Sequence, residues 1–186
     1  MNWTGRLLVA TPAIEHPDFS RTVILLLQHD EEDGALGLIL NRPLVTEIAE
    51  VLPDWIDLTG SPPVVFGGGP VQPTGAICLG RRRPGGPLVG AFSELEGSPV
   101  VGTIDLDCPA ADLTSVVEAV RVFAGYAGWS AGQLEDEVAD GDWWVLDALP
   151  GDAFSSAPAL LWSQVLRRQG PPLAFAATHP ADVTLN

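Results

Sequence analysis

Short apolar runs separated by turn residues dominate the first half of the chain. Arg6–Ala10 reads as a short apolar strand that ends at Thr11-Pro12. Thr22–His29 is longer, rich in leucine and β-branched residues and free of polar alternation, which indicates a strand buried on both faces or central in its sheet. The charged turn 30–34 ends in Asp-Gly, a hairpin signal, and predicts that Ala35–Leu40 returns as the partner strand.

Helical and strand patterns alternate in the second half. The clearest helical spacing is that of Leu113, Val116, Val117 and Val120, at i, i+3, i+4 and i+7, and it predicts a helix over Ala111–Val122. The other predicted helices are Thr46–Leu52, Ala131–Ala139 and Ala157–Gln169. The other predicted strands are Pro63–Phe66, Gly75–Leu79, Val100–Leu106, Phe123–Trp129 and Trp143–Leu146. The segment Arg81–Gly97 is predicted to be irregular and mobile.

The order of these segments predicts the fold class. Strands come first, in hairpins, and helices are interspersed later, which favours an α+β fold over a doubly wound sheet. The chain has 186 residues, of which 46% are hydrophobic, enough for one continuous core. With no internal repeat or linker in view, we expect residues 1–186 to form one compact domain.

The charged residues exclude several functions. All nine basic residues are arginine, against 24 acidic residues, for a net charge of −15. Without lysine there can be no P-loop lysine, no kinase-type strand lysine and no Schiff base with a pyridoxal cofactor. The acidic balance argues against a nucleic-acid partner, because binding to phosphate backbones needs clustered cations. We therefore expect no nucleic-acid partner and no cofactor.

Metal ligands and targeting segments have no clear signature. Cys78 and Cys108 lie far apart without zinc-type spacing, and His16 and His29 lack a second ligand at i+4, so each histidine is interpreted as a hydrogen-bonded structural residue. No signal peptide or apolar run of membrane-spanning length is visible. We expect a soluble, cytoplasmic protein with no metal site and no membrane partner.

Several motifs together resemble the YqgE/AlgH family. They are Gly5–Pro12, Phe19–Val23, His29-Asp30, Gly34–Pro43, Gly68–Val71 and Gly125–Trp129 with Gly132–Glu135 and Glu137, followed by the final helix with Trp162 and Gly170. The resemblance covers essentially the whole chain. It implies a compact α+β domain with coiled, branching mixed sheets and peripheral helices, a cytoplasmic location and a regulatory context. It implies no catalytic residue, and Leu79-Gly80 departs from the leucine-histidine pair of many relatives.

One motif raises the possibility of a serine hydrolase. Gly128-Trp129-Ser130-Ala131-Gly132 matches G-x-S-x-G between a predicted strand and a predicted helix, and Asp147 or Asp152 and then His179 follow in the order of such enzymes. However, Ser130 and Gln133 also match a capping box, in which the hydroxyl caps the helix and Gln133 reaches back. We favour the capping interpretation and expect no enzymatic activity.

The best candidate ligand site is at the open end of the first hairpin. If His29 lies opposite Ala35, Thr22 faces Arg42 and Val23 faces Asn41, so Arg21 and Arg42 emerge close together. These guanidinium groups need a negative partner, which is either Asp18, Glu15 or Glu47, or a bound carboxylate or phosphate.

The sequence thus predicts Arg21, Asn41 and Arg42 as ligand-binding residues of a module for an anionic small molecule. The glycines of the segment 67–70 fail the dinucleotide fingerprint and are interpreted as a tight turn between strands. The identity of a ligand or protein partner and the oligomeric state stay open.

Overall fold

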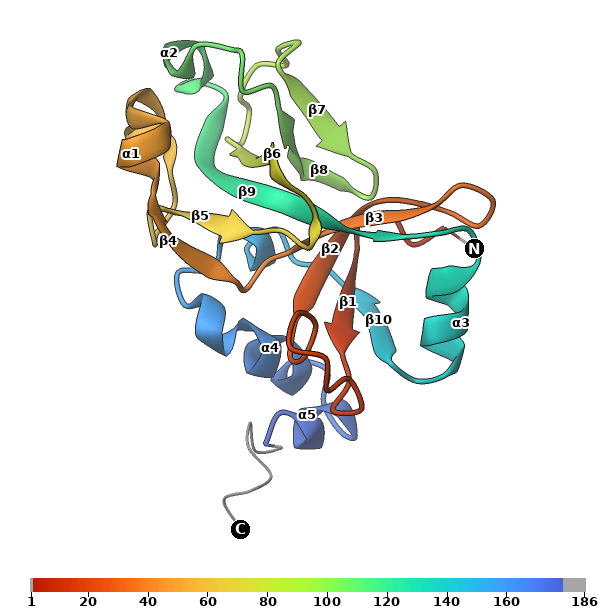
Figure 1. The fold of residues 1–186 in the computed structure, drawn as a ribbon. Helices are drawn as coiled ribbons and strands as arrows, with labels where there is room; N and C mark the ends of the chain where they lie inside the picture. The colour runs from red at the N-terminus through yellow and green to blue at the C-terminus, as the bar shows by residue number, and fades with distance from the viewer. Residues whose placement is uncertain (1, 179–186) are drawn as a thin grey trace.

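A branched, mainly antiparallel sheet organises the chain, and the computed structural model describes residues 2–178 (Figure 1). Eight of its ten strands follow the order β10-β1-β2-β3-β9-β6-β8-β7, and the other two lie off this path, with β5 pairing with β9 and with β4. The strands are β1 (Arg6–Ala10), β2 (Val23–Asp30), β3 (Gly34–Ile39), β4 (Pro43–Glu47), β5 (Val64–Gly67), β6 (Val71–Arg82), β7 (Phe92–Leu95), β8 (Ser98–Ile104), β9 (Val117–Trp129) and β10 (Trp143–Asp147).

Strand β9 is the branch point of the sheet. Its first half pairs with β6, its middle pairs in parallel with β5, and its last residues pair with β3. The bend lies at Gly125, which has a φ of +69°. A Cβ on Gly68 would lie 2.2 Å from the carbonyl oxygen of Gly125, so the two backbones can approach only because Gly68 lacks a side chain. Residues 68–70 carry the chain across β9 from β5 to β6, which pair with opposite edges of β9, so the tight turn expected at residues 67–70 is wrong and close packing is the reason for its glycines.

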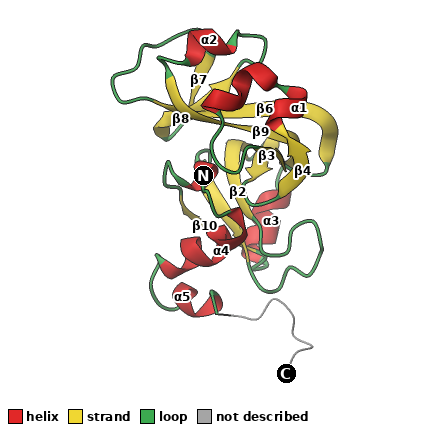
Figure 2. Cartoon of the chain, turned by 90° about the vertical axis from the view of Figure 1, so that its left-hand side faces the viewer, coloured by secondary structure: helices red, strands yellow, loops and turns green. Residues whose placement is uncertain are grey.

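Helices cover the outside of the sheet. Figure 2 shows α4 and α5 at the end of the molecule opposite α1 and α2. The buried face of α4 is Leu161, Trp162, Val165 and Leu166, as the sequence predicts, and the Trp162 indole donates to the carbonyl of Ala10 on β1 at 2.9 Å. The helices are α1 (Ile48–Val51), α2 (Ala110–Leu113), α3 (Gln133–Ala139), α4 (Pro158–Arg167) and α5 (Leu173–Ala176), with 3-10 turns η1 (Pro53–Leu58) and η2 (Asp152–Phe154). The expected α+β class, with a branching mixed sheet and peripheral helices, is confirmed.

The helix predicted over Ala111–Val122 is wrong. Only α2 and one further turn are helical, and the chain then enters β9, whose first half pairs with β6 from Val117 to Ala124. Every residue from Ala119 to Phe123 is buried, so both faces of this strand are covered. A continuous buried run satisfies helical spacing as well as strand spacing, and its β-branched valines suit the strand.

Two other local predictions are also wrong. The helix expected at Thr46–Leu52 begins only at Ile48, because residues 43–47 form β4. The segment Arg81–Gly97 is not wholly irregular, since β6 continues through Arg82 and β7 occupies Phe92–Leu95. Both errors concern strands that are defined by pairing with distant partners. No helix in the described part of the chain is long and apolar enough to cross a membrane.

Candidate anion-binding site

The register of the first hairpin brings the predicted site residues together. His29 lies opposite Ala35, as expected, but a bulge between Leu26 and Gln28 shifts the remaining pairs by one residue. The sequence predicts that Arg42 lies opposite Thr22. If the pairing of Ile24 with Ile39 is extended to the end of the hairpin, Arg42 instead lies opposite Arg21. The two arginines therefore leave the hairpin at the same level.

Asn41 positions the backbone of this corner. Its side chain is buried, its Oδ1 accepts a hydrogen bond from the amide of Val23 at 3.0 Å, and its Nδ2 donates to the carbonyl of Arg21 at 2.9 Å. These two side-chain bonds replace backbone hydrogen bonds between the strands at the end of β2. The side-chain amide thus holds the hairpin end closed and is directed at the protein backbone.

Arg21 turns away from Arg42 towards α4. Its φ of +56° is uncommon for a residue other than glycine. Its guanidinium carbon lies 4.6 Å from the centre of the Trp162 ring, a cation–π arrangement. Arg21 therefore packs against α4.

Arg42 is the arginine that faces a cavity. The cavity has a volume of about 220 Å³ and is lined by Pro17, Asp18, Ile39, Arg42, Gly67, Gly69 and Pro70. The half-buried guanidinium donates to the carbonyl oxygens of Ser20 and Asn41. A guanidinium has five N–H donors, so these two bonds leave donors for another acceptor.

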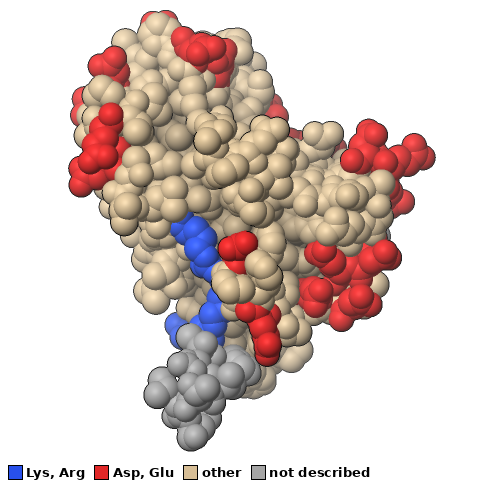
Figure 3. Space-filling model, in the orientation of Figure 1, with Lys and Arg blue, Asp and Glu red and all other residues tan. Residues whose placement is uncertain are grey.

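The electrostatics of this cavity centre on Arg42 and Asp18. Burial lowers the pKa of Arg42 from its ordinary value, and the charge of Asp18 opposes that shift. Within residues 2–178 no carboxylate lies within 4 Å of the Arg42 guanidinium as an ion pair. Figure 3 shows that the arginine atoms visible on this face form one stripe between the β4 region and the α4–α5 end, beside an acidic group. The sequence indicated Asp18 only as an ion-pair partner, and it did not indicate that Gly67 and Gly69 line the cavity.

The candidate hydrolase residues are held by other partners. Asp147 forms an ion pair with Arg6 at 3.0 Å, and both carboxylate oxygens of Asp152 bind Arg168, at 2.6 and 2.7 Å. Ser130 is exposed beside a cavity of about 340 Å³. Between Asn2 and Thr178 no hydrogen bond joins Ser130 to either acid or to a histidine, and His179 lies outside the described residues.

Only half of the expected capping box is present. The Gln133 side chain reaches back and accepts a hydrogen bond from the Ser130 amide at 3.1 Å. The N-cap residue of α3 is Gly132, however, and the helix has no side-chain cap. Ser130 therefore lies two residues before the N-cap, too early for its hydroxyl to cap the helix as expected.

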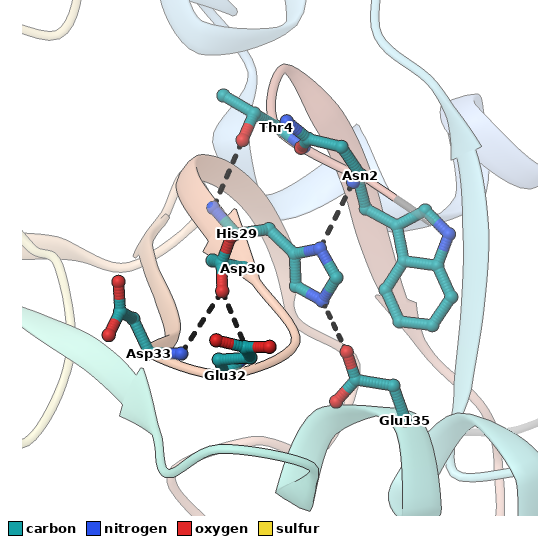
Figure 4. A network of polar contacts seen from close by, with 8 residues as sticks. Asn2, Thr4, His29, Asp30, Glu32, Asp33 and Glu135 are labelled. Carbon is teal, nitrogen blue, oxygen red and sulfur yellow. Dashed lines mark hydrogen bonds and ion pairs between the residues drawn. The ribbon is translucent and has the colours of Figure 1, made fainter.

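His29 is the centre of a network of polar contacts (Figure 4). Its side chain is 1% exposed, its Nδ1 accepts from the Trp3 amide at 3.2 Å, and its Nε2 lies 2.8 Å from a carboxylate oxygen of Glu135. Acceptance at Nδ1 places the proton on Nε2, which donates to Glu135. The structural role expected for His29 is confirmed, and no group of three or more possible metal ligands occurs among the described residues.

The fold defines a class: a branched-sheet α+β domain with peripheral helices. Comparison with known proteins then gives the family, since the AlgH-like family model matches residues 7–174. A UPF0301 protein of Streptomyces coelicolor is 48% identical over 98% of this chain and 95% of its own, and one of Mycobacteroides abscessus is 44% identical over 98% and 87%. The chain belongs to the AlgH-like family.

Two solved structures agree with this assignment. The crystal structure of a Corynebacterium diphtheriae protein superposes with a TM-score of 0.89 at 31% identity, covering 95% of this chain and 92% of that one. The solution structure of AlgH from Pseudomonas aeruginosa gives a TM-score of 0.69 at 29% identity, covering 98% and 96%. The fold is therefore shared with both proteins.

Proposed function

We propose that this protein is a cytosolic, non-enzymatic binding protein with a regulatory role, and that its ligand is a small anion bound at Arg42. One observation carries the proposal: a half-buried guanidinium lines a cavity without a carboxylate partner at ion-pair distance among residues 2–178. Arginine offers a planar fork of donors that matches a carboxylate or a phosphate. The net charge of −15 supports a small ligand over a nucleic acid.

The surroundings limit which part of the ligand enters. A volume of about 220 Å³ accommodates a carboxylate or phosphate group with a few further atoms. Asp18 lines the same cavity, and its side chain is 59% exposed, with His16 at 3.9 Å as its ion-pair partner among residues 2–178. An incoming anion therefore competes with Asp18 for Arg42, which favours moderate affinity and a readily reversed signal.

An NMR titration with inorganic phosphate and with succinate tests this function. We expect amide shifts at Asp18, Arg42, Gly67 and Gly69, and we expect Arg42→Gln to remove them. Arg83→Gln is the matched control, because Arg83 is exposed on the loop after β6 and its side chain donates to the Thr114 carbonyl. Equal responses of both variants, or shifts confined to other surfaces, would refute an anion site at Arg42.

A further inference from the structure

The segment 44–56 carries an unusual amount of exposed apolar surface. Eight large hydrophobic side chains of the described residues are exposed, and four of them belong to this short stretch. Val45 on β4 is 97% exposed, so it makes almost no contact with its own chain. The other three are Leu44 at 41%, Val51 at 50% and Ile56 at 37%. Clustered exposed apolar residues commonly mark an interaction surface.

Strand β4 also has a free backbone edge. It pairs with β5 on one side, and no other strand of the described chain pairs with it. The carbonyl of Arg42 and the amide of Ile48 bond to the β5 side. A bulge between Pro43 and Glu47 interrupts the pairing with β5, and Val45 lies in this bulge without a partner residue on β5. An exposed, apolar edge strand is a template for another strand.

The charges around this edge specify the partner. The chain from Pro43 to Gly80 contains no arginine, whereas Glu47, Glu50, Asp54 and Asp57 all lie exposed close to the apolar side chains. Figure 3 shows acidic atoms in the area of α1, whereas the arginine stripe begins beside β4. A second copy of this chain would bring the same four acids to the contact, and like charges in close contact repel. A cationic strand has complementary charge.

We propose that the outer edge of β4 binds an extended segment of a partner protein that alternates basic and apolar residues. The segment adds as a strand beside Val45, and main-chain hydrogen bonds supply much of the affinity. Its apolar side chains cover Val45 and its neighbours Leu44 and Val51, and its basic side chains reach Glu47 and Glu50. This surface adjoins the anion site, because Leu44 lies beside Gly67, which lines the cavity next to Arg42.

The first experiment is an NMR titration with an acetylated, amidated hexapeptide of alternating arginine and valine. We expect the largest amide shifts at Val45, Thr46 and Glu47. Two control peptides separate the contributions of charge and of main-chain hydrogen bonds. In the first, glutamate replaces arginine. The second carries N-methyl groups on alternate residues, so that one edge of the peptide has no N–H donors. Both controls should bind at least about tenfold more weakly. Equal binding of all three peptides, or no shift at β4, would overturn the proposal.

A substitution at the edge gives the second test. Val45→Arg should weaken hexapeptide binding about tenfold through charge repulsion and lost apolar contact. Leu160→Arg is the matched control, because Leu160 is 56% exposed on α4 and far from β4 in sequence. Val45 is 97% exposed, so its replacement leaves the fold intact. Sedimentation velocity must show a monomer; self-association that Val45→Arg abolishes would mean that a second copy occupies the edge, and would overturn the proposal.

Discussion

Arg121 and Arg42 both extend from the sheet, yet they meet opposite environments. Arg121 is 1% exposed in the middle of β9, and its guanidinium carbon lies 4.2 Å from the centre of the Phe66 ring. It donates to the carbonyl oxygens of Ala153, Ser155 and Ser61, at 3.2, 3.0 and 2.7 Å. Burial lowers the pKa of Arg121 to about 10, so it stays charged at neutral pH.

Arg42, in contrast, is half-buried and bonds carbonyls of its own corner, Ser20 and Asn41. Arg121 connects β9 to two distant segments, at Ser61 and at 153–155, although its Nε has no hydrogen-bond partner among the described residues. This difference distinguishes a structural arginine from one that is suited to binding a ligand. A cation whose donors are used by distant backbone is structural, whereas one that keeps donors towards a cavity is suited to binding.

The largest effect should come from Arg121→Met. The substitution leaves three carbonyl oxygens without their donor in a buried site, and we expect a loss of about 3 kcal/mol or more in the free energy of unfolding. Urea unfolding followed by tryptophan fluorescence measures it. Arg83→Met, at an exposed arginine, should stay within about 0.5 kcal/mol. A loss at Arg121 no greater than at Arg83 would contradict a structural role.

A smaller loss in the free energy of unfolding is expected for His29→Phe, which removes a buried polar side chain. The ring can still stack on Trp3, whose centre lies 4.7 Å away, but the contacts to the Trp3 amide and to Glu135 disappear. We expect about 2 kcal/mol of destabilisation in the same urea assay. His16→Phe, at a histidine with 66% side-chain exposure, is the control and should change little. Similar losses of unfolding free energy for both variants would show that the hydrogen bonds of His29 do not stabilise the fold.

Asp18→Asn should alter binding at Arg42 and leave stability nearly unchanged. Removing the carboxylate removes the competitor of an incoming anion, so phosphate affinity should rise about threefold to tenfold. Isothermal calorimetry at low ionic strength measures the dissociation constant. Unchanged or weaker phosphate binding would show that Asp18 does not oppose the anion.

The smallest effect is expected for Ser130→Ala. A capping box predicts a loss of about 1 kcal/mol, but α3 begins with Gly132 as its N-cap, so we expect a change within about 0.5 kcal/mol. Labelling with a fluorophosphonate probe gives the complementary readout. We expect none, since no described histidine or acid contacts the Ser130 hydroxyl; labelling that Ser130→Ala abolishes would favour a nucleophile.

Local patterns determined much of this protein. The apolar run at β1 and the buried face of α4 follow from side-chain spacing alone, and the acidic turn with its Asp-Gly end specifies the β2–β3 hairpin. The motif set also indicated the family that the comparisons confirm. Each of these features depends on residues close together in sequence, so one short window contains the information.

Tertiary contacts decided the rest. Whether residues 114–123 form helix or strand depended on the distant strand β6, because burial on both faces is compatible with either period. The bulge at Leu26, the divergence of Arg21 towards Trp162 and the cavity beside Arg42 likewise arise where separate segments meet. The sequence predicted that two arginines would approach one another. Only packing determined which one faces the cavity, because a side chain's direction depends on neighbours that sequence spacing does not specify.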